Sequence, residues 1–433
     1  MSPRPARRRT SPMRAEPRRV WITGMGLITA AGSGREAFEA GLRRGCSPVR
    51  AIDRFDASAF RSRVAAQVDD FDPLDHMPPK TARQLDRFSQ FGLVAGQQAL
   101  ADAALSPGAT DGPAAERIGI YLGSALGGIA YAEIQHEKYM ERGIRAVAPN
   151  LALAVFGGAA PANLGIALGV RGPILSTANS CASGAVALGE ALGAIRNGEI
   201  DAAIAGGVEV PLSPLAFGAF DIIRALSAGH NESPATASRP FDEDRDGFVM
   251  GEAAALLVLE AADIAERRGA QPYAELMGYG ASSDAFHMVQ PRPDGTEAAR
   301  AVTIALADAD VGAEEIEYVN AHASSTPIGD LAEARAIALA LGSRAGAVPV
   351  SGTKALYGHP LGASGAIEAA ICALAIARGW APATVNLSVP DPEVLELLPG
   401  LLQAGRPGTY RRVLSTSFGF GGLNAALVFG SVA

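Results

Sequence analysis

The stretch "STANSCASGAVALGEAL" (Ser176–Leu192) places a single cysteine, Cys181, on a turn of small residues directly before a helical pattern. Two interpretations of this cysteine are open. As a packing residue, it is a small apolar side chain suited to a core. As a chemical group, it sits at a helix N-terminus, where the helix dipole lowers the pKa of a thiol and makes it nucleophilic. Motifs elsewhere in the sequence are needed to distinguish between the two interpretations.

On either side of this stretch, short apolar strands alternate with longer helical patterns. The predicted strands are 19–24, 117–123, 201–210, 255–260, 317–322, 348–352 and 412–419. The predicted helices include 80–105, 182–197, 296–308 and 363–378. Such alternation indicates an α/β fold with a largely parallel sheet component.

The helix that follows Cys181 has a counterpart later in the chain. Two short motifs recur in the same order, "ASGAV" (182–186) as "ASGAI" (363–367) and "AALLV" (254–258) as "AALVF" (425–429). Ordered matches at nearly one spacing predict an internal duplication, with halves at 19–267 and 268–433. The turn that carries Cys181 would then be pseudo-symmetric to the loop "KALYGHPLG".

Bulk properties limit the possible functions. A chain of 433 residues is long enough for two domain-sized units, and a formal net charge of -8 gives no support for nucleic-acid binding. The three cysteines, Cys46, Cys181 and Cys372, lie far apart and have neither disulfide-framework nor metal-ligand spacing. A reducing, cytoplasmic setting is therefore expected.

Two segments could be mistaken for targeting signals. Residues 1–18 are rich in Arg and Pro and lack the apolar block of a signal peptide, so we expect a disordered tail. A basic interaction arm and a true start at Met13 are the alternatives. Residues 151–170 have the length of a membrane span, but Pro161 interrupts them, which predicts two buried helical pieces and no membrane segment here or elsewhere.

Chemistry-bearing side chains gather in loops that follow predicted strands. Of six histidines, His322 lies in "VNAHASSTPIGD" and His359 in "GTKALYGHPLGASG". Lys354, one of only three lysines, precedes His359 by five residues. Each histidine alone could be an ordinary loop or core residue. Together with Cys181, they mark three small-residue loops at strand ends, where a ligand can approach closely.

Five motifs extend this pattern over the chain: "NSCASG", "SRPFDEDRDGFVMGE", "NAHASSTPIGD", "GTKALYGHPLGASG" and "TSFGFGGLNAALVF". In this order they resemble the motifs of elongating β-ketoacyl-[acyl-carrier-protein] synthases, from about Arg19 to Phe429. The early "FDASAFRSRVAAQVDDFDP" is similar to ketosynthases of fatty-acid and type II polyketide systems. The resemblance implies the thiolase fold, in which two related halves form five layers, α-β-α-β-α.

The resemblance also implies a reaction. Cys181 would accept an acyl chain from the phosphopantetheine thioester of a carrier protein, which suits the nucleophilicity of a thiolate. His322 and His359 would promote decarboxylation of a malonyl-carrier protein and stabilise the enolate, because imidazole N–H groups can bind the developing negative charge. A Claisen condensation then gives a β-ketoacyl-carrier protein. Neither a metal nor a cofactor is needed.

Further site residues are implied by position in the family motifs. Lys354 would pair with Glu368, although a purely structural ion pair is compatible with the same positions. Asp330 and Glu333 would support this network. The backbone N–H groups of Cys181 and Phe420 would form an oxyanion hole, with Phe420 also gating the acyl chain. The implied substrate-binding residues are Ser324, Thr326 and Phe418.

The implied partners are an acidic acyl carrier protein and a second subunit. Lys80 and Arg83 match the basic docking surface of the family, although a solvated helix face would have the same composition. The second subunit would make either a homodimer or a heterodimer with a chain-length factor. The segments 129–140 and 217–223 are candidates for setting the depth of the acyl pocket.

Several positions depart from the family pattern: Asn179, Ala253, Ala255, Ala323, Tyr357 and Leu423. Side chains added to tight backbone cost little only where φ stays negative. None of these changes removes a catalytic group, and together they indicate a specialised polyketide or fatty-acid pathway.

Two other functions remain as alternatives. A thiolase or starter synthase acting on coenzyme A would share the fold, but "GTKALYGHPLG" favours a Cys-His-His set. A non-catalytic chain-length factor would lack the nucleophilic cysteine, which is present here. Neither acyl chain length nor pathway follows from the sequence.

Overall fold

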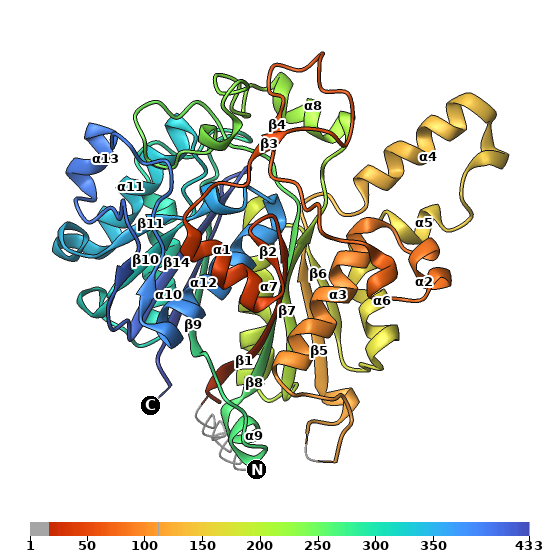
Figure 1. Cartoon of the computed structure of the whole chain (residues 1–433). Helices are drawn as coiled ribbons and strands as arrows, with labels where there is room; N and C mark the ends of the chain where they lie inside the picture. The colour runs from red at the N-terminus through yellow and green to blue at the C-terminus, as the bar shows by residue number, and fades with distance from the viewer. Residues whose placement is uncertain (1–16, 111, 433) are drawn as a thin grey trace, which may run out of the picture.

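The structure, a computed structural model, describes residues 17–110 and 112–432. Their main strands form two five-stranded sheets, continuous with each other, around a shared pair of helices (Figure 1). The predicted tail, 1–18, lies outside the described residues except for Pro17 and Arg18. Arg18 forms ion pairs with Asp201 and Asp263, each at 2.9 Å.

The first half of the chain forms five strands of a mixed sheet. Their spatial order is β6 (Ile174–Thr177), β5 (Ile118–Gly123), β7 (Ala202–Glu209), β8 (Ala253–Ala261) and β1 (Val20–Thr29). The first three run parallel, whereas β8 is antiparallel to β7 and β1 to β8. The continuous apolar runs of β5 and β7 suit strands that are covered on both faces.

The second half repeats this arrangement. Its order is β11 (Val350–Gly352), β10 (Tyr318–Ala321), β14 (Arg412–Gly419), β15 (Leu423–Gly430) and β9 (Ala274–Ser283), with the same strand directions. The two sets join where β1 and β9 pair antiparallel over Trp21–Glu275 and Ile22–Ala274. The matching order and directions confirm the predicted pseudo-duplicated fold.

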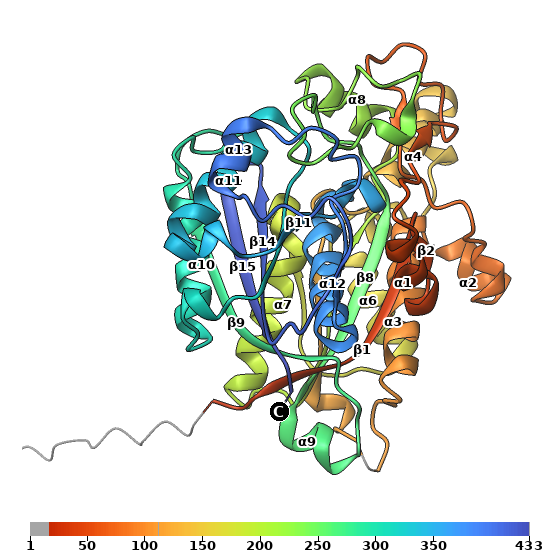
Figure 2. The same ribbon diagram turned by 60° about the vertical axis from the view of Figure 1, so that its left-hand side comes forward.

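Helices form the other three layers (Figure 2). The outer helices are α3 (Arg87–Asp102) and α6 (Ala159–Leu168) on the first sheet, and α10 (Thr296–Asp308) and α11 (Pro327–Leu341) on the second. Between the sheets lie α7 (Ser183–Arg196) and α12 (Ser364–Arg378), which contact strands of both halves. The five-layered α-β-α-β-α architecture is therefore confirmed.

The remaining α-helices and strands lie around these elements. The helices are α1 (Arg35–Arg44), α2 (Pro79–Gln84), α4 (Ile129–Arg142), α5 (Leu151–Ala154), α8 (Pro214–Ile222), α9 (Ala262–Arg267) and α13 (Pro392–Leu397). The strands are β2 (Gly32–Ser33), β3 (Arg50–Ala51), β4 (Val64–Ala65), β12 (Trp380–Ala381) and β13 (Arg406–Pro407). Helix α4 projects from the body of the molecule (Figure 1).

All seven predicted strands are present, but three helix predictions need correction. The helix predicted over 80–105 is two helices, α2 and α3, because Leu85 is extended and Asp86 caps α3 through the N–H of Ser89. Segment 151–170 does form two helical pieces, yet Leu153 and Ile166 are exposed. From the sequence, no other segment is expected to resemble a membrane span. Leu361–Arg378 is long and apolar enough to cross a membrane, but 83% of it is buried in the protein.

The two central helices cross at small residues near their N-terminal ends. A Cβ added to Gly365 would lie 2.8 Å from the Cβ of Ala185, and one added to Gly184 would lie 3.0 Å from the carbonyl oxygen of Gly362. These distances leave no room for a side chain. The recurring "ASGA" motif therefore brings the starts of α7 and α12 together.

We expect Gly365→Ala to lower the free energy of unfolding by about 1–3 kcal/mol, because overpacking forces the two helices apart. Chemical denaturation followed by circular dichroism measures this change. Gly193→Ala on α7 is the matched control, since an added Cβ there meets nothing within 4 Å. Equal stability of the Gly365→Ala variant and the wild type would contradict the close crossing.

Candidate active site

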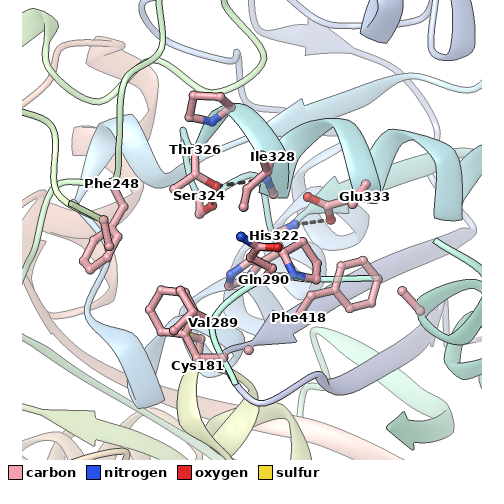
Figure 3. A pocket seen from close by; sticks show the side chains of 18 of the residues that line it. Cys181, Phe248, Val289, Gln290, His322, Ser324, Thr326, Ile328, Glu333 and Phe418 are labelled. Atoms are coloured by element: carbon pink, nitrogen blue, oxygen red, sulfur yellow. Dashed lines mark hydrogen bonds between the residues drawn. The ribbon is translucent and has the colours of Figure 1, made fainter. Parts of the chain in front are cut away.

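Cys181 lies in the 3-10 turn η4 (Ser180–Ala182), which leads directly into α7. Ser180 adopts a left-handed conformation with a φ of 53°. The hydroxyl of Ser183 accepts a hydrogen bond from the N–H of Asn179 at 2.8 Å and donates one to the carbonyl of Ser180 at 2.7 Å. This sharp turn holds the thiol at the wall of a cavity, with only 4% of Cys181 exposed (Figure 3).

Burial dominates the electrostatics of this thiol and raises the pKa of Cys181 to about 11. The charge of Lys354 and the N–H of Phe420 favour the thiolate, but they do not outweigh burial. The expectation that the helix N-terminus lowers the pKa is therefore wrong in its net direction. The thiol is protonated at neutral pH and needs a base.

His322 follows β10, where buried groups fix its backbone. Its N–H donates to Glu333 at 2.7 Å and to Thr416 at 3.2 Å, and the N–H of Ala323 donates to the other oxygen of Glu333 at 2.6 Å. Ala323 has a φ of 37°, in the left-handed region. Its side chain therefore strains the backbone at one of the positions that depart from the family pattern. The carboxylate of Glu333 thus offsets a backbone strain of about 1–2 kcal/mol.

His359 lies in the loop before α12. Its N–H donates to the carbonyl of Val249 at 2.7 Å, and its Nδ1 lies 2.8 Å from the hydroxyl of Ser364. The ring of Phe248 packs edge-on against the imidazole with a centroid distance of 5.1 Å. Backbone, hydroxyl and aromatic contacts together fix the orientation of this ring.

The three predicted side chains converge although they are distant in sequence. One ligand-type atom of each of Cys181, His322 and His359 lies within 4.8 Å of the others. The two imidazole rings are 5.2 Å apart between centroids and nearly perpendicular. All three side chains are buried and line one cavity. A single acyl group can therefore contact the sulfur and both rings.

A buried ion pair lies behind His322. Lys354 donates hydrogen bonds to Glu368, to the carbonyl of His322 and, at 3.2 Å, to Nδ1 of His322. Burial and the charge of Lys354 hold the pKa of both His322 and His359 well below the usual range, so both rings are neutral. Because Nδ1 of His322 accepts from an ammonium group, its proton is on Nε2.

The cavity has a volume of about 370 Å³ and contains the predicted substrate-binding residues. Ser324 and Thr326 line it with their hydroxyls 2.9 Å apart (Figure 3). Phe418 and Phe420 line it on the side of β14. The polar pair and the aromatic pair suit a ligand that is part polar arm and part apolar chain.

Comparison with known proteins identifies the family. A model described as "Beta-ketoacyl synthase, N-terminal domain" matches residues 17–265, and one described as "Beta-ketoacyl synthase, C-terminal domain" matches residues 273–388. The chain belongs to the β-ketoacyl synthase family. The first family domain contains Cys181 and the second contains both histidines, so the cavity joins the two domains.

Individual relatives are similar in sequence to nearly the whole of this chain. The chain is 40% identical over 413 residues to a 3-oxoacyl-[acyl-carrier-protein] synthase 2 of Staphylococcus aureus, covering 95% of this chain and 98% of the relative. It is 41% identical over 415 residues to the protein of that name from Synechocystis, covering 96% and 98%.

Solved ketosynthase structures superpose closely. A β-ketoacyl synthase from Burkholderia phymatum has a TM-score of 0.88 and 36% identity, covering 96% of this chain and all of that chain. A type II polyketide ketosynthase, solved in complex with its acyl-carrier protein and bound to the hexaketide, has a TM-score of 0.88 and 30% identity at the same coverage.

Some predicted residues lie away from the β-ketoacyl synthase cavity. Lys80 and Arg83 are on α2 and do not line it. Of the two segments predicted to set pocket depth, 217–223 contributes only Ile223 to the cavity wall, and 129–140 contributes no residue within the described part of this chain. The docking role of Lys80 and Arg83 and the influence of the two segments on pocket depth stay predictions.

Two buried residues beside the cavity were not predicted. Ser364 holds His359, and its signal was the recurring "ASG" motif, in which it corresponds to Ser183 at the cysteine turn. Glu209 accepts hydrogen bonds from the N–H groups of Ala125, Leu126 and Gly362 and so ties the two halves together. The only indication of Glu209 in the sequence was an acidic residue near the end of the apolar strand "DAAIAGGVEV".

We expect the alkylation rate of Cys181 to rise about tenfold per pH unit between pH 7 and 9, because the reactive thiolate forms only above a raised pKa. Iodoacetamide labelling followed by peptide mass spectrometry measures this in a Cys46→Ser background, since Cys46 is exposed. A rate that levels off below pH 8 would contradict the dominance of burial.

Proposed function

We propose that this chain catalyses the decarboxylative Claisen condensation that elongates an acyl chain by two carbons on an acyl carrier protein. The observation that carries the proposal is the convergence of Cys181, His322 and His359 in one buried cavity. The enzyme is thus an acyltransferase, as its family membership indicates.

In the first half-reaction, the sulfur of Cys181 attacks the acyl thioester of the carrier protein. A new C–S bond forms, and the C–S bond to the pantetheine breaks. His359 takes the thiol proton and returns it to the leaving pantetheine thiol, because its Nε2 has a free lone pair when Nδ1–H donates to Ser364. The N–H groups of Cys181 and Phe420 bind the oxyanion.

In the second half-reaction, the C–C bond to the malonyl carboxylate breaks and CO₂ leaves with formation of an enolate. The Nε2–H of His322 donates to the enolate oxygen, and Lys354 maintains that tautomer. His359 is a second donor, because the Ser364 hydroxyl can donate or accept at Nδ1. The enolate carbon then attacks the acyl thioester, and the thiolate of Cys181 leaves.

Both substrates would arrive on the phosphopantetheine of a carrier protein, since a relative is named for acyl-carrier protein and a similar ketosynthase is solved in complex with its acyl-carrier protein. The hydroxyls of Ser324 and Thr326 would bind the pantetheine amides. We propose Lys80 and Arg83 as contacts for an acidic carrier protein, since positive charge steers such encounters. The protonated Nε2 of His322 offers no lone pair, so we assign no metal to the cavity.

Pathway, cellular location and domain boundaries are finer proposals. The departures at Ala323, directly after His322, and at Tyr357, which contacts Glu368 behind the cavity, favour a specialised polyketide or fatty-acid pathway. A cytoplasmic location agrees with the three cysteines, which form no disulfide within the described residues. The repeated topology supports halves at 19–267 and 268–433, each descended from one ancestral unit.

A coenzyme A-dependent thiolase or starter synthase is disfavoured by the paired imidazoles, and a chain-length factor by the presence of Cys181. An active ketosynthase that pairs with a chain-length factor remains open, since one similar structure is "the ishigamide ketosynthase/chain length factor".

A second subunit would pair at β6. This strand hydrogen-bonds to β5 on one side only in the described chain, and its residues Ile174 and Leu175 are 44% and 41% exposed. An uncovered apolar edge strand is a template for pairing with another chain. We propose that two copies of this chain join their sheets here.

We expect the wild type to be a homodimer and Leu175→Lys to be a monomer, because a buried charge at the paired edge costs several kcal/mol. Size-exclusion chromatography with light scattering measures the mass. Leu395→Lys on α13, also 41% exposed, is the matched control and should stay dimeric. A wild type that dimerises only with a chain-length factor would replace the homodimer proposal.

We expect incubation with acyl-carrier proteins to add one acyl group to the wild type and none to Cys181→Ala, because the proposed mechanism places the acyl group on this sulfur. Intact-mass spectrometry over a series of acyl lengths measures this and ranks the substrates. Cys46→Ala is the control and should be acylated normally. Acylation from coenzyme A thioesters alone would instead support the starter-synthase alternative.

A further inference from the structure

Behind the cavity, the hydroxyl of Tyr357 contacts the carboxylate that binds Lys354. Its oxygen lies 3.4 Å from Oε1 of Glu368 and 2.9 Å from the hydroxyl oxygen of Thr353. Tyr357 is fully buried and does not line the cavity, so it cannot touch a substrate there. It is also one of the positions that depart from the family pattern, which has a small residue before "GH".

The chemistry of the two neighbours sets the direction of these hydrogen bonds. A phenol has one proton to donate, and a carboxylate accepts more strongly than a hydroxyl. Thr353 can donate its own proton to the phenolic oxygen, which leaves the phenolic proton for Glu368. Burial and the charge of Glu368 raise the pKa of Tyr357 well above its usual value, so it remains a donor.

We propose that Tyr357 is a positioning residue whose hydroxyl keeps Glu368 ionised, so that Lys354 stays against Nδ1 of His322 and the Nε2–H faces the substrate. This inference rests on the proposed function, in which that N–H binds the enolate oxygen. The relay runs from Tyr357 through Glu368 and Lys354 to His322 without a gap.

The charge of Glu368 is sensitive to a single hydrogen bond near neutral pH. Burial raises its pKa to about 7, while Lys354 and Tyr357 favour the ionised form and Glu333 opposes it. Its second oxygen, Oε2, has no hydrogen-bond partner among the described residues. The titratable groups around it are Lys354 and Tyr357 from the loop after β11, Glu333 from α11, Cys372 from α12 itself and, beside Tyr357, Tyr318 from β10.

Replacing Tyr357 by Phe removes the donor and keeps the ring. We expect the acid limb of malonyl-carrier-protein decarboxylation to move up by about one pH unit, because Glu368 loses support for its charge. If the pKa rises from about 7 to about 8, the ionised fraction at pH 7 falls about fivefold. The loss appears in kcat with KM unchanged, and it largely disappears near pH 9. Release of labelled CO₂ measures both constants over the pH range.

A matched control separates this effect from loss of packing. Tyr410 is buried in the same hydrophobic cluster, and its hydroxyl donates to the backbone carbonyl of Arg406 at 2.9 Å. Tyr410→Phe should change stability without moving the acid limb. If Tyr357→Phe folds poorly, Thr353→Val tests the same relay, because it leaves Glu368 as the remaining hydrogen-bond partner of the phenol. The acid limb should then not move up, and an upward shift would overturn the inference.

Glu368→Gln completes a double-mutant cycle, since an amide cannot titrate. In that background, adding Tyr357→Phe should change the pH profile no further. A Tyr357→Phe profile equal to the wild type, or a shift that persists with Glu368→Gln, would overturn the inference. Failure of the wild type to decarboxylate malonyl-carrier protein would instead overturn the proposed function, so the two failures are distinguishable.

Discussion

The close crossing of α7 and α12 is the constraint on which the rest of the molecule depends. Both helices lie between the two sheets, and each starts with the residues Ala-Ser-Gly-Ala. Glycine at 184 and 365 lets the backbones approach to a distance that no larger residue allows. Since each helix begins at the end of a loop that carries chemistry, this crossing brings the turn of Cys181 beside the loop of His359.

Burial then sets the properties of the groups that meet there. It raises the pKa of the thiol of Cys181 and lowers the pKa of both imidazoles, so all three are neutral at rest. A neutral thiol beside a neutral ring can pass its proton over a short distance, and a neutral ring can donate to an enolate. The charged groups, Lys354 and Glu368, form an ion pair behind His322 and do not line the cavity. From there Lys354 fixes the tautomer of His322.

Much of the fold could be predicted from the sequence, wherever a short stretch of residues was enough to identify an element. Apolar runs marked the strands, and the repeated "ASGA" and "AAL" motifs marked equivalent elements of the two halves. The helix predicted over 80–105 failed at Leu85, because helical spacing continues through a residue that the next cap forces to be extended. Strand β6 was not predicted, because only two of its four residues are apolar and they give no strand-length apolar run.

The site divides in the same way. The sequence by itself predicted which side chains meet at the cavity, because Cys181, His322, His359 and Lys354 stand in motifs that resemble those of one family. Only the tertiary structure decided their protonation, since the pKa of a buried group depends on neighbours far away in sequence. The helix N-terminus predicted a lowered thiol pKa, but burial by both halves raised it. Tyr357 likewise acquires a place in the site only when the fold brings its hydroxyl to Glu368.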